Sequence, residues 1–341
     1  MLRNIRLMTF LMLCGWAATS VPARAQHFEQ IPGSLTQIAA GRSEVWGLNG
    51  SEVFRFDASS KKFNQISGSL AQIAVGGGSL LQRDQVWGVN AARTVYRFDF
   101  SKNAFARMPG NLNQIAVGKG NADTINPDNC HAYEVWGIGP GPNPGGNLWR
   151  YNFCTSSFDN IQNPHSSPVE PVTQIAVGDS NVWANDAVWP SEYINGGWYQ
   201  GDQWGGNLEQ VAVGVDEDVW GIRSDNGGTL VRFSPGTGTF EQICIAVCQS
   251  GGAPSPVLVA TGGEGAWIVY YEAPNLEIAR YTNLGSQQPI VQGSVFSWLA
   301  GTGSVVQVAV GSGAGVWVIT KRISLGRGGG ASYQVWAYVR P

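Results

Sequence analysis

The sequence predicts an all-β protein, folded as a single seven-bladed β-propeller of four-stranded antiparallel blades. Three observations support this prediction: a composition unfavourable to helices, one phrase that repeats along the chain, and a tryptophan that recurs at blade-length spacing. The 341 residues include 46 glycines, 17 prolines and 14 tryptophans, and only 13% of residues are charged. Glycine and proline disfavour helices, whereas valine, tyrosine, phenylalanine and tryptophan suit the half-buried surface of a sheet.

The repeated phrase has four parts in its first copy, and a second copy follows almost unchanged from Phe63 to Asp99. A valine–tryptophan or alanine–tryptophan pair marks each of seven copies, 37 residues apart at the closest and 50 at the widest. This is the length of one four-stranded propeller blade. The parts of the first copy are Phe28–Leu35, Gln37–Gly41, Val45–Asn49 and Val53–Asp57. The recurring tryptophans are Trp46, Trp87, Trp136, Trp183, Trp220, Trp267 and Trp317.

Each copy contains four short apolar or alternating runs separated by Gly, Asn, Asp or Ser, which indicates strands joined by tight turns. The small, apolar Gln-Ile-Ala run suits the inner strand, where blades converge. Val-Trp-Gly follows as the second strand, Val-Phe-Arg-Phe as the third and Phe-Asn-Gln-Ile as the outer strand. We expect the tryptophans to be structural anchors between blades, because a residue at the same strand position in every blade is typical of packing.

The two ends of the chain predict how the ring closes. The first copy begins with an outer-strand segment, Phe28–Ile31, that has no preceding blade, and the last copy stops after a third strand, Gln334–Val339. The last blade is therefore expected to take the N-terminal segment as its outer strand. Closure of this kind protects the edges of the sheets.

These motifs resemble the tectonin-repeat propellers, a family that includes secreted lectins of animals, fungi and slime moulds. The resemblance lies in Gly-Ser-Leu-x-Gln-Ile-Ala-x-Gly, then Val-Trp-Gly followed by Val or Leu and Asn, then Val-Tyr/Phe-Arg. The copies depart from it at Ala184 and Ile268, each directly after its tryptophan. The resemblance implies a lectin-like propeller. Many members have six repeats, so six blades is the alternative count.

Residues 1–25 are predicted to be a cleaved secretory signal peptide, with residues 26–341 forming the propeller. Arg3 and Arg6 precede an apolar run, and Ala23-Arg24-Ala25 fits a signal-peptidase site. A retained membrane anchor and a lipid anchor on Cys14 are the alternatives. We therefore expect a secreted or periplasmic protein without a transmembrane segment after processing.

The four remaining cysteines predict two disulfides, as is usual in an oxidising compartment. Cys130 precedes the second strand of the third copy and Cys154 follows its third strand, so an antiparallel hairpin brings them together. Cys244 and Cys248 then form the second pair. A zinc site at Cys130 and His131 lacks further ligands at the usual spacing, and we predict no metal site.

The candidate ligand-binding residues lie in the fourth copy and in two turns. Trp189 and Tyr193 are placed in a connecting loop, where an aromatic face flanked by Glu192 and Asn195 could hold a sugar ring. Packing of that loop on its own blade is the alternative. Two further candidates follow second strands, where asparagine also satisfies turn geometry. They are Asn49 and Asn90.

Arginine recurs on the predicted third strands, where it could bind hydroxyls or a carboxylate. A structural role, in which it pairs with Asp57, Asp99 or a carbonyl, is the alternative. The arginines are Arg55, Arg97, Arg150, Arg232 and Arg280.

Catalysis finds little support, and no enzyme is predicted. The chain lacks a Gly-x-Ser-x-Gly elbow and a His-Glu-x-x-His run. Carboxylates at a central mouth would permit glycoside cleavage, but nothing selects a pair. The acids considered are Asp123, Asp186, Asp216 and Glu264. No cofactor is predicted, although the acidic run 216–218 could hold calcium.

The sequence therefore favours a non-catalytic, lectin-like carbohydrate-binding protein with several loop or interblade sites. Its partner would be a carbohydrate or glycoconjugate. A scaffold that binds another envelope or extracellular protein is the alternative, and a polysaccharide-degrading propeller enzyme is a more distant one. The net charge of −3 and the absence of a basic stripe exclude nucleic acid as a partner.

Overall fold

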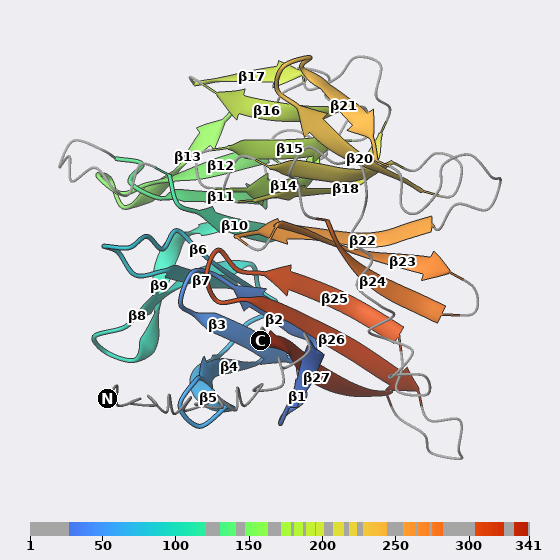
Figure 1. Cartoon of the computed structure of the whole chain (residues 1–341). Helices are drawn as coiled ribbons and strands as arrows, with labels where there is room; N and C mark the ends of the chain where they lie inside the picture. Colours follow the sequence, from blue (N-terminus) through green and yellow to red (C-terminus); the bar gives the residue numbers. More distant parts are fainter. Residues whose placement is uncertain are drawn as a thin grey trace, which may run out of the picture.

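The computed structural model shows an all-β ring in which seven antiparallel sheets follow one another in chain order (Figure 1). Six sheets have four strands, and the sixth blade has three among the described residues. The seven-blade prediction is confirmed. The structure describes residues 27–120, 130–140, 147–162, 172–178, 181–186, 189–194, 196–200, 207–214, 218–223, 228–243, 255–263, 265–272, 275–281, 304–323 and 331–339.

Within a blade the first strand lies nearest the axis and the chain then moves outward. Blade one comprises β2 (Gln37–Ala40), β3 (Val45–Asn49), β4 (Glu52–Asp57) and β5 (Lys62–Ser69). Blade two comprises β6 (Gln72–Gly76), β7 (Gln85–Val89), β8 (Thr94–Asp99) and β9 (Ala104–Asn111). Blade three comprises β10 (Gln114–Gly118), β11 (Glu134–Gly139), β12 (Asn147–Asn152) and β13 (Ser157–Ile161).

The remaining blades repeat this order. Blade four comprises β14 (Val172–Val177), β15 (Val182–Asp186), β16 (Pro190–Ile194) and β17 (Gly197–Gln200). Blade five comprises β18 (Leu208–Val213), β19 (Val219–Arg223), β20 (Thr229–Ser234) and β21 (Thr239–Gln242). Blade six comprises β22 (Ser255–Gly262), β23 (Gly265–Glu272) and β24 (Asn275–Tyr281). Blade seven comprises β25 (Ser304–Val310), β26 (Val316–Ile323), β27 (Ala331–Val339) and β1 (His27–Ile31).

The ring closes through β1, which is the outer strand of blade seven. It pairs antiparallel with β27, from His27 opposite Val339 to Ile31 opposite Val335. In Figure 1 the blue β1 lies beside the red β27, so the two ends of the described chain share one sheet. The expected closure by the N-terminal strand is therefore present.

The seven recurring tryptophans fill the spaces between blades. Five are fully buried, and Trp267 and Trp317 are 3% and 4% exposed. Each ring meets an aromatic ring from the third strand of the next blade edge-on, with centroids 4.6–4.9 Å apart. Edge-to-face contact adds stability beyond the area buried. The partners, in blade order from Trp46, are Phe98, Tyr151, Tyr193, Phe233, Tyr281, Tyr338 and Phe56.

A second seam joins the first strands of adjacent blades through glutamine side chains. The Gln174 side chain accepts from the Val211 N–H at 2.9 Å and donates to the Val211 carbonyl at 3.0 Å. Such bonds satisfy backbone groups that the innermost edge of a sheet would leave unpaired. Leu258 occupies the equivalent position in blade six. The glutamines are Gln37, Gln72, Gln114, Gln174, Gln210 and Gln307.

The propeller has two faces. On one face of the ring, the first strand of each blade begins and the second strand ends. We call this the start face, and we call the other the opposite face. Near the axis on the opposite face, small residues from all seven blades surround a space of about 70 Å³. A Cβ atom added to Gly76 or Gly178 would lie 2.3 Å from a backbone oxygen of the next blade, so glycine permits this close approach.

Candidate functional site

A polar cavity of about 610 Å³ opens on the start face, where blades two, three and four meet. Its walls come from the beginnings of β6, β10 and β14, the end of β11, and the turn after β7. The polar lining consists mainly of side-chain amides, one threonine and one arginine. These residues are Gln72, Asn90, Arg93, Asn113, Gln114 and Thr173.

The turn between β7 and β8 projects Arg93 into this lining. The Asn90 side-chain oxygen accepts from the Thr94 N–H at 2.9 Å, and the Asn90 carbonyl accepts from the Arg93 N–H at 2.8 Å. Arg93 has a φ of 64°, an uncommon left-handed conformation for a residue other than glycine. Its carbonyl accepts from the Leu112 N–H at 3.0 Å. Bonds on both sides therefore hold the backbone of Arg93, an exposed residue, in the lining of the cavity.

The other polar groups divide into those used by the fold and those turned to solvent. Gln72 and Gln114 bind the first strands of the next blades, and the Thr173 hydroxyl donates to the Asn185 carbonyl at 3.1 Å. Asn113 is exposed, and its N–H donates to the Ile138 carbonyl at 2.6 Å. The side chains of Arg93 and Asn113 are thus the best placed to bind a ligand.

The structure brings only part of the predicted ligand set to this face. Asn90 lines the cavity. Asn49 ends β3 on the start face of blade one, outside the cavity lining. Trp189, directly before β16, donates its N–H to Asp186 at 2.9 Å on the start face of blade four. Asn195 lies outside the described residues.

The predicted loop position of Tyr193 and Glu192 is wrong. Both residues lie on β16, opposite Val182 and Trp183 respectively. The Tyr193 ring packs against Trp136 at 4.9 Å and Trp198 at 5.1 Å. The unusually short fourth copy concealed this third strand, which places the Tyr193 ring in the interblade seam.

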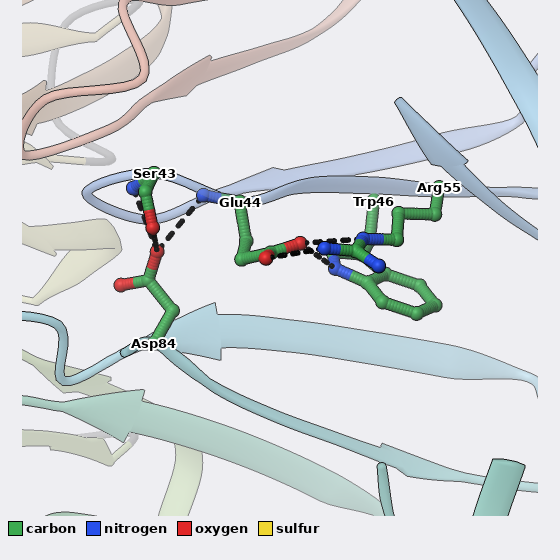
Figure 2. Close-up of polar contacts among 5 residues, drawn as sticks. All are labelled: Ser43, Glu44, Trp46, Arg55 and Asp84. Carbon is green, nitrogen blue, oxygen red and sulfur yellow. Dashed lines mark hydrogen bonds and ion pairs between the residues drawn. The ribbon is translucent and has the colours of Figure 1, made fainter. Parts of the chain in front are cut away.

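Four of the third-strand arginines bind other side chains of the fold, as in the structural alternative, but their partners are not Asp57 or Asp99. Arg55 binds Glu44 through two hydrogen bonds of 2.7 and 2.8 Å, and Glu44 also accepts from the Trp46 indole at 3.1 Å (Figure 2). Glu134 with Arg150, and Asp218 with Arg232, repeat the arrangement in blades three and five. The register explains it: Arg55 pairs with Trp46 across the strands, and Glu44 is two residues away on the same face.

The acids first expected to bind these arginines serve local turns instead. Asp57 accepts from the Ser59 N–H at 2.9 Å, and Asp99 accepts from the Ser101 N–H at 2.9 Å. Hydrogen bonds from the serines lower the pKa of both carboxyls below the usual range. In blade two Gln85 replaces the acid and accepts from Arg97 at 2.9 Å.

One buried carboxylate, which has no counterpart in the repeated phrase, links blades one and two. Asp84 is fully buried and accepts from the N–H groups of Ser43, Glu44 and Arg42 at 2.7–3.0 Å, and from that of Gly78 at 3.0 Å. Figure 2 shows its bonds to Ser43 and Glu44 next to the Arg55 network. The acid two residues before the tryptophan in blades one, three and five was a usable sequence signal. Asp84 was not, because its partners belong mainly to another blade.

A disulfide joins Cys130 and Cys154, the predicted pair, with 4.9 Å between their Cα atoms. Cys244 and Cys248 lie outside the described residues. Burial and the charge of Arg150 lower the pKa of the neighbouring His131. Within the described residues no group of acidic, histidine or cysteine side chains has the arrangement of a metal site. No helix there is long and apolar enough to cross a membrane.

These features define a seven-bladed β-propeller with an aromatic and glutamine-based interblade seam and a polar cavity on its start face. The tectonin domain family matches residues 34–232, and the chain belongs to this family.

Comparison with solved structures shows the same fold at low sequence identity. The chain is similar to YCF48 bound to D1 peptide, with a TM-score of 0.58 and 12% identity over 92% of this chain and 97% of that one. It is also similar to U3-55K, with a TM-score of 0.56 and 10% identity over 91% and 98% of the two chains. No curated protein matches the chain significantly.

Proposed function

We propose that the protein is an exported, non-catalytic carbohydrate-binding protein whose principal site is the start-face cavity of blades two to four. The observation that carries the proposal is the lining of that cavity, which combines residues with amide, hydroxyl and guanidinium groups with apolar residues such as Val89 and Ile138. Such a mixture of directional polar groups and apolar surface suits a molecule rich in hydroxyls.

The charge of the cavity narrows the range of glycans that it could bind. Among its described lining residues Arg93 carries the only charge. A guanidinium donates two parallel hydrogen bonds to hydroxyl or carboxylate oxygens and repels a cation. We therefore infer a neutral or acidic glycan rather than an amino sugar with a free ammonium group.

The same lining supports a binding role over a catalytic one. Its described residues include no carboxylate, imidazole or thiol, so they offer no acid–base pair for cleaving a glycosidic bond. Asp186, the described member of the four candidate catalytic acids, is 2% exposed and accepts a hydrogen bond from the Trp189 N–H. Asn49 and Trp189 on the same face offer places for weaker sites, and several weak sites on one ring would increase avidity for a repetitive glycan.

Export is supported by the disulfide, because such bonds persist in oxidising compartments. The predicted signal peptide lies outside the described residues. We place the protein in the periplasm or outside the cell, with residues 26–341 as its mature form.

A protein-binding scaffold is the second candidate. The similar propeller YCF48 is bound to a peptide, and loops held by a rigid ring can bind many partners. The experiment that separates the two functions is a glycan-array screen of residues 26–341, with and without calcium. Binding to related glycans supports the proposal, and calcium dependence would show whether an ion takes part. A folded protein that binds no glycan but retains a protein partner would favour the scaffold.

A further inference from the structure

The connection between β6 and β7 presents two adjacent leucines to solvent on the opposite face. Leu80 and Leu81 are 86% and 83% exposed, the highest values among the exposed large hydrophobic residues described. In the closely similar blade one, Gly41 to Glu44 make the same connection, whereas blade two uses the longer run from Gly77 to Asp84. The leucines therefore belong to an extension of one blade and do not contribute to the repeat.

This extension is held in a defined shape. Ser79 donates its N–H to the Gln82 carbonyl at 2.9 Å, and its hydroxyl accepts from the Leu81 N–H at 3.2 Å. The Tyr133 hydroxyl of blade three donates to the Gln82 side chain. Bonds from its own blade and from a neighbour thus fix the position of the tip.

Asp84 anchors the base of the extension. Its buried carboxylate accepts N–H groups from blade one and from Gly78 of the extension itself. Figure 2 shows this carboxylate directed at the turn of Ser43 and Glu44. A buried charge is costly unless it is fully hydrogen-bonded, so the base of the extension must stay where these N–H groups surround the carboxylate. The leucines at its tip are therefore held in a fixed place.

Near the tip, a positively charged side chain is exposed to solvent, whereas most of the negatively charged side chains are buried. Arg83 is exposed, and its guanidinium carbon lies 4.5 Å from the Phe100 ring centroid. The described carboxylates of Glu44, Asp84 and Glu134 are buried and hydrogen-bonded. The carboxylate of Asp99, which precedes Phe100 in the chain, is partly exposed and pairs with Lys102 at 3.0 Å. The exposed charge closest in the chain to the leucines is therefore the positive charge of Arg83.

We propose that this tip, Leu80 and Leu81 with Arg83, docks the protein on an anionic lipid surface. The leucines enter the interface between headgroups and acyl chains while the guanidinium binds lipid phosphate. Apolar side chains and cations act together in peripheral membrane binding. The site lies on the opposite face from the proposed glycan cavity, so the two activities are independent and can act simultaneously.

Co-flotation of residues 26–341 with vesicles tests this proposal. One set of vesicles contains phosphatidylcholine alone, and the other contains added phosphatidylglycerol. We expect binding mainly to the second set, and binding that weakens as salt is added. Equal binding to both sets would overturn the anionic part of the proposal, and no binding to either would overturn all of it.

Substitutions at the tip test whether Leu80, Leu81 and Arg83 make the contact with the membrane. Leu80→Ser with Leu81→Ser should weaken partitioning by at least about a hundredfold, since each leucine is worth about tenfold or more. Arg83→Gln should weaken it about fivefold with phosphatidylglycerol only. Leu80→Met with Leu81→Met should bind like the wild type, as should Tyr271→Ser, the matched control in blade six, where Tyr271 is 50% exposed.

Two further measurements exclude trivial explanations. Circular dichroism and the unfolding midpoint must match the wild type in every variant. Glycan binding by the double serine variant should also be unchanged. A folded double serine variant that floats as well as the wild type would contradict the proposed contact, whatever the result with glycans.

Discussion

At the scale of single residues, two kinds of polar group define this propeller. Asp84 is buried completely and binds backbone N–H groups of two blades. Arg93 has the opposite character, because it is exposed and its left-handed backbone is held by the turn around it. Strained residues of this kind often occur at binding sites. The buried acid is therefore assigned to the fold and the exposed arginine to the site.

Asp84→Ala should lower the free energy of unfolding by about 3 kcal/mol or more, because it leaves several buried N–H groups without an acceptor. Denaturant unfolding with a constant slope measures this change. Asp99→Ala is the control, since Asp99 caps a solvent-exposed turn and its loss should matter much less. Equal effects of the two substitutions would show that Asp84 does not anchor the blades.

At the scale of elements, the first strand of each blade acts as the joint between neighbours. Its glutamine side chain continues the hydrogen-bonding edge into the next blade, while the tryptophan of the second strand packs between the sheets. In blade six Leu258 replaces the glutamine and packs in the apolar cluster between blades six and seven. The contact between blades six and seven therefore relies on apolar packing, whereas the contacts between the other blades also include hydrogen bonds from a glutamine.

Gln174→Ala should destabilise the protein by about 1–3 kcal/mol, because the Val211 N–H and C=O lose their side-chain partner. Gln65→Ala is the matched control: Gln65 donates to Glu52 on the exposed surface, and such contacts contribute little. Thermal unfolding of both variants provides the comparison. Indistinguishable midpoints would argue against a stabilising role for the glutamine joints.

At the scale of the whole molecule, the ring depends on a strand from the opposite end of the chain. Phe28 of β1 contacts Trp267 at 5.9 Å and Tyr338 at 5.5 Å, so this strand seals the space between blades six and seven. Without it, β27 would expose a full strand edge. Exposed edges pair with other chains.

A chain that begins at residue 32 should therefore unfold at a lower temperature and form dimers or larger assemblies, whereas one that begins at residue 26 should remain unaffected. Size-exclusion chromatography and thermal unfolding measure both effects. A truncated protein that remained monomeric and equally stable would mean that β1 is not needed for closure.

Most of the fold could be predicted from the sequence because the repeat is strong. The tryptophan spacing gave seven blades, and the unmatched segment Phe28–Ile31 gave the closure. The fourth copy was harder, because its third strand, Pro190–Ile194, lacks the usual arginine and carries Glu192 opposite Trp183. Irregular copies hide their register, and register determines which face a side chain occupies.

The candidate site was less predictable than the fold, for a physical reason. Its walls come from three blades, and a single copy of the repeat contains only a fraction of them. Asn90 was identified from its turn position, whereas Arg93 and Asn113 were not, because nothing local indicates that they line the same cavity. The far neighbours of Asp84 were hidden in the same way.

The central claim is that the start-face cavity binds glycans, and affinity measurements on two cavity variants test it most directly. Arg93→Asn removes the guanidinium but tolerates the left-handed backbone, and Asn113→Ala removes an exposed amide. With a glycan identified on the array, titration calorimetry should show Arg93→Asn binding at least about tenfold more weakly than the wild type, because charged hydrogen bonds are lost. Asn113→Ala should bind about threefold to tenfold more weakly, because neutral amide hydrogen bonds are lost. Unchanged affinity in both folded variants would contradict the account and place carbohydrate binding, if present, elsewhere on the ring.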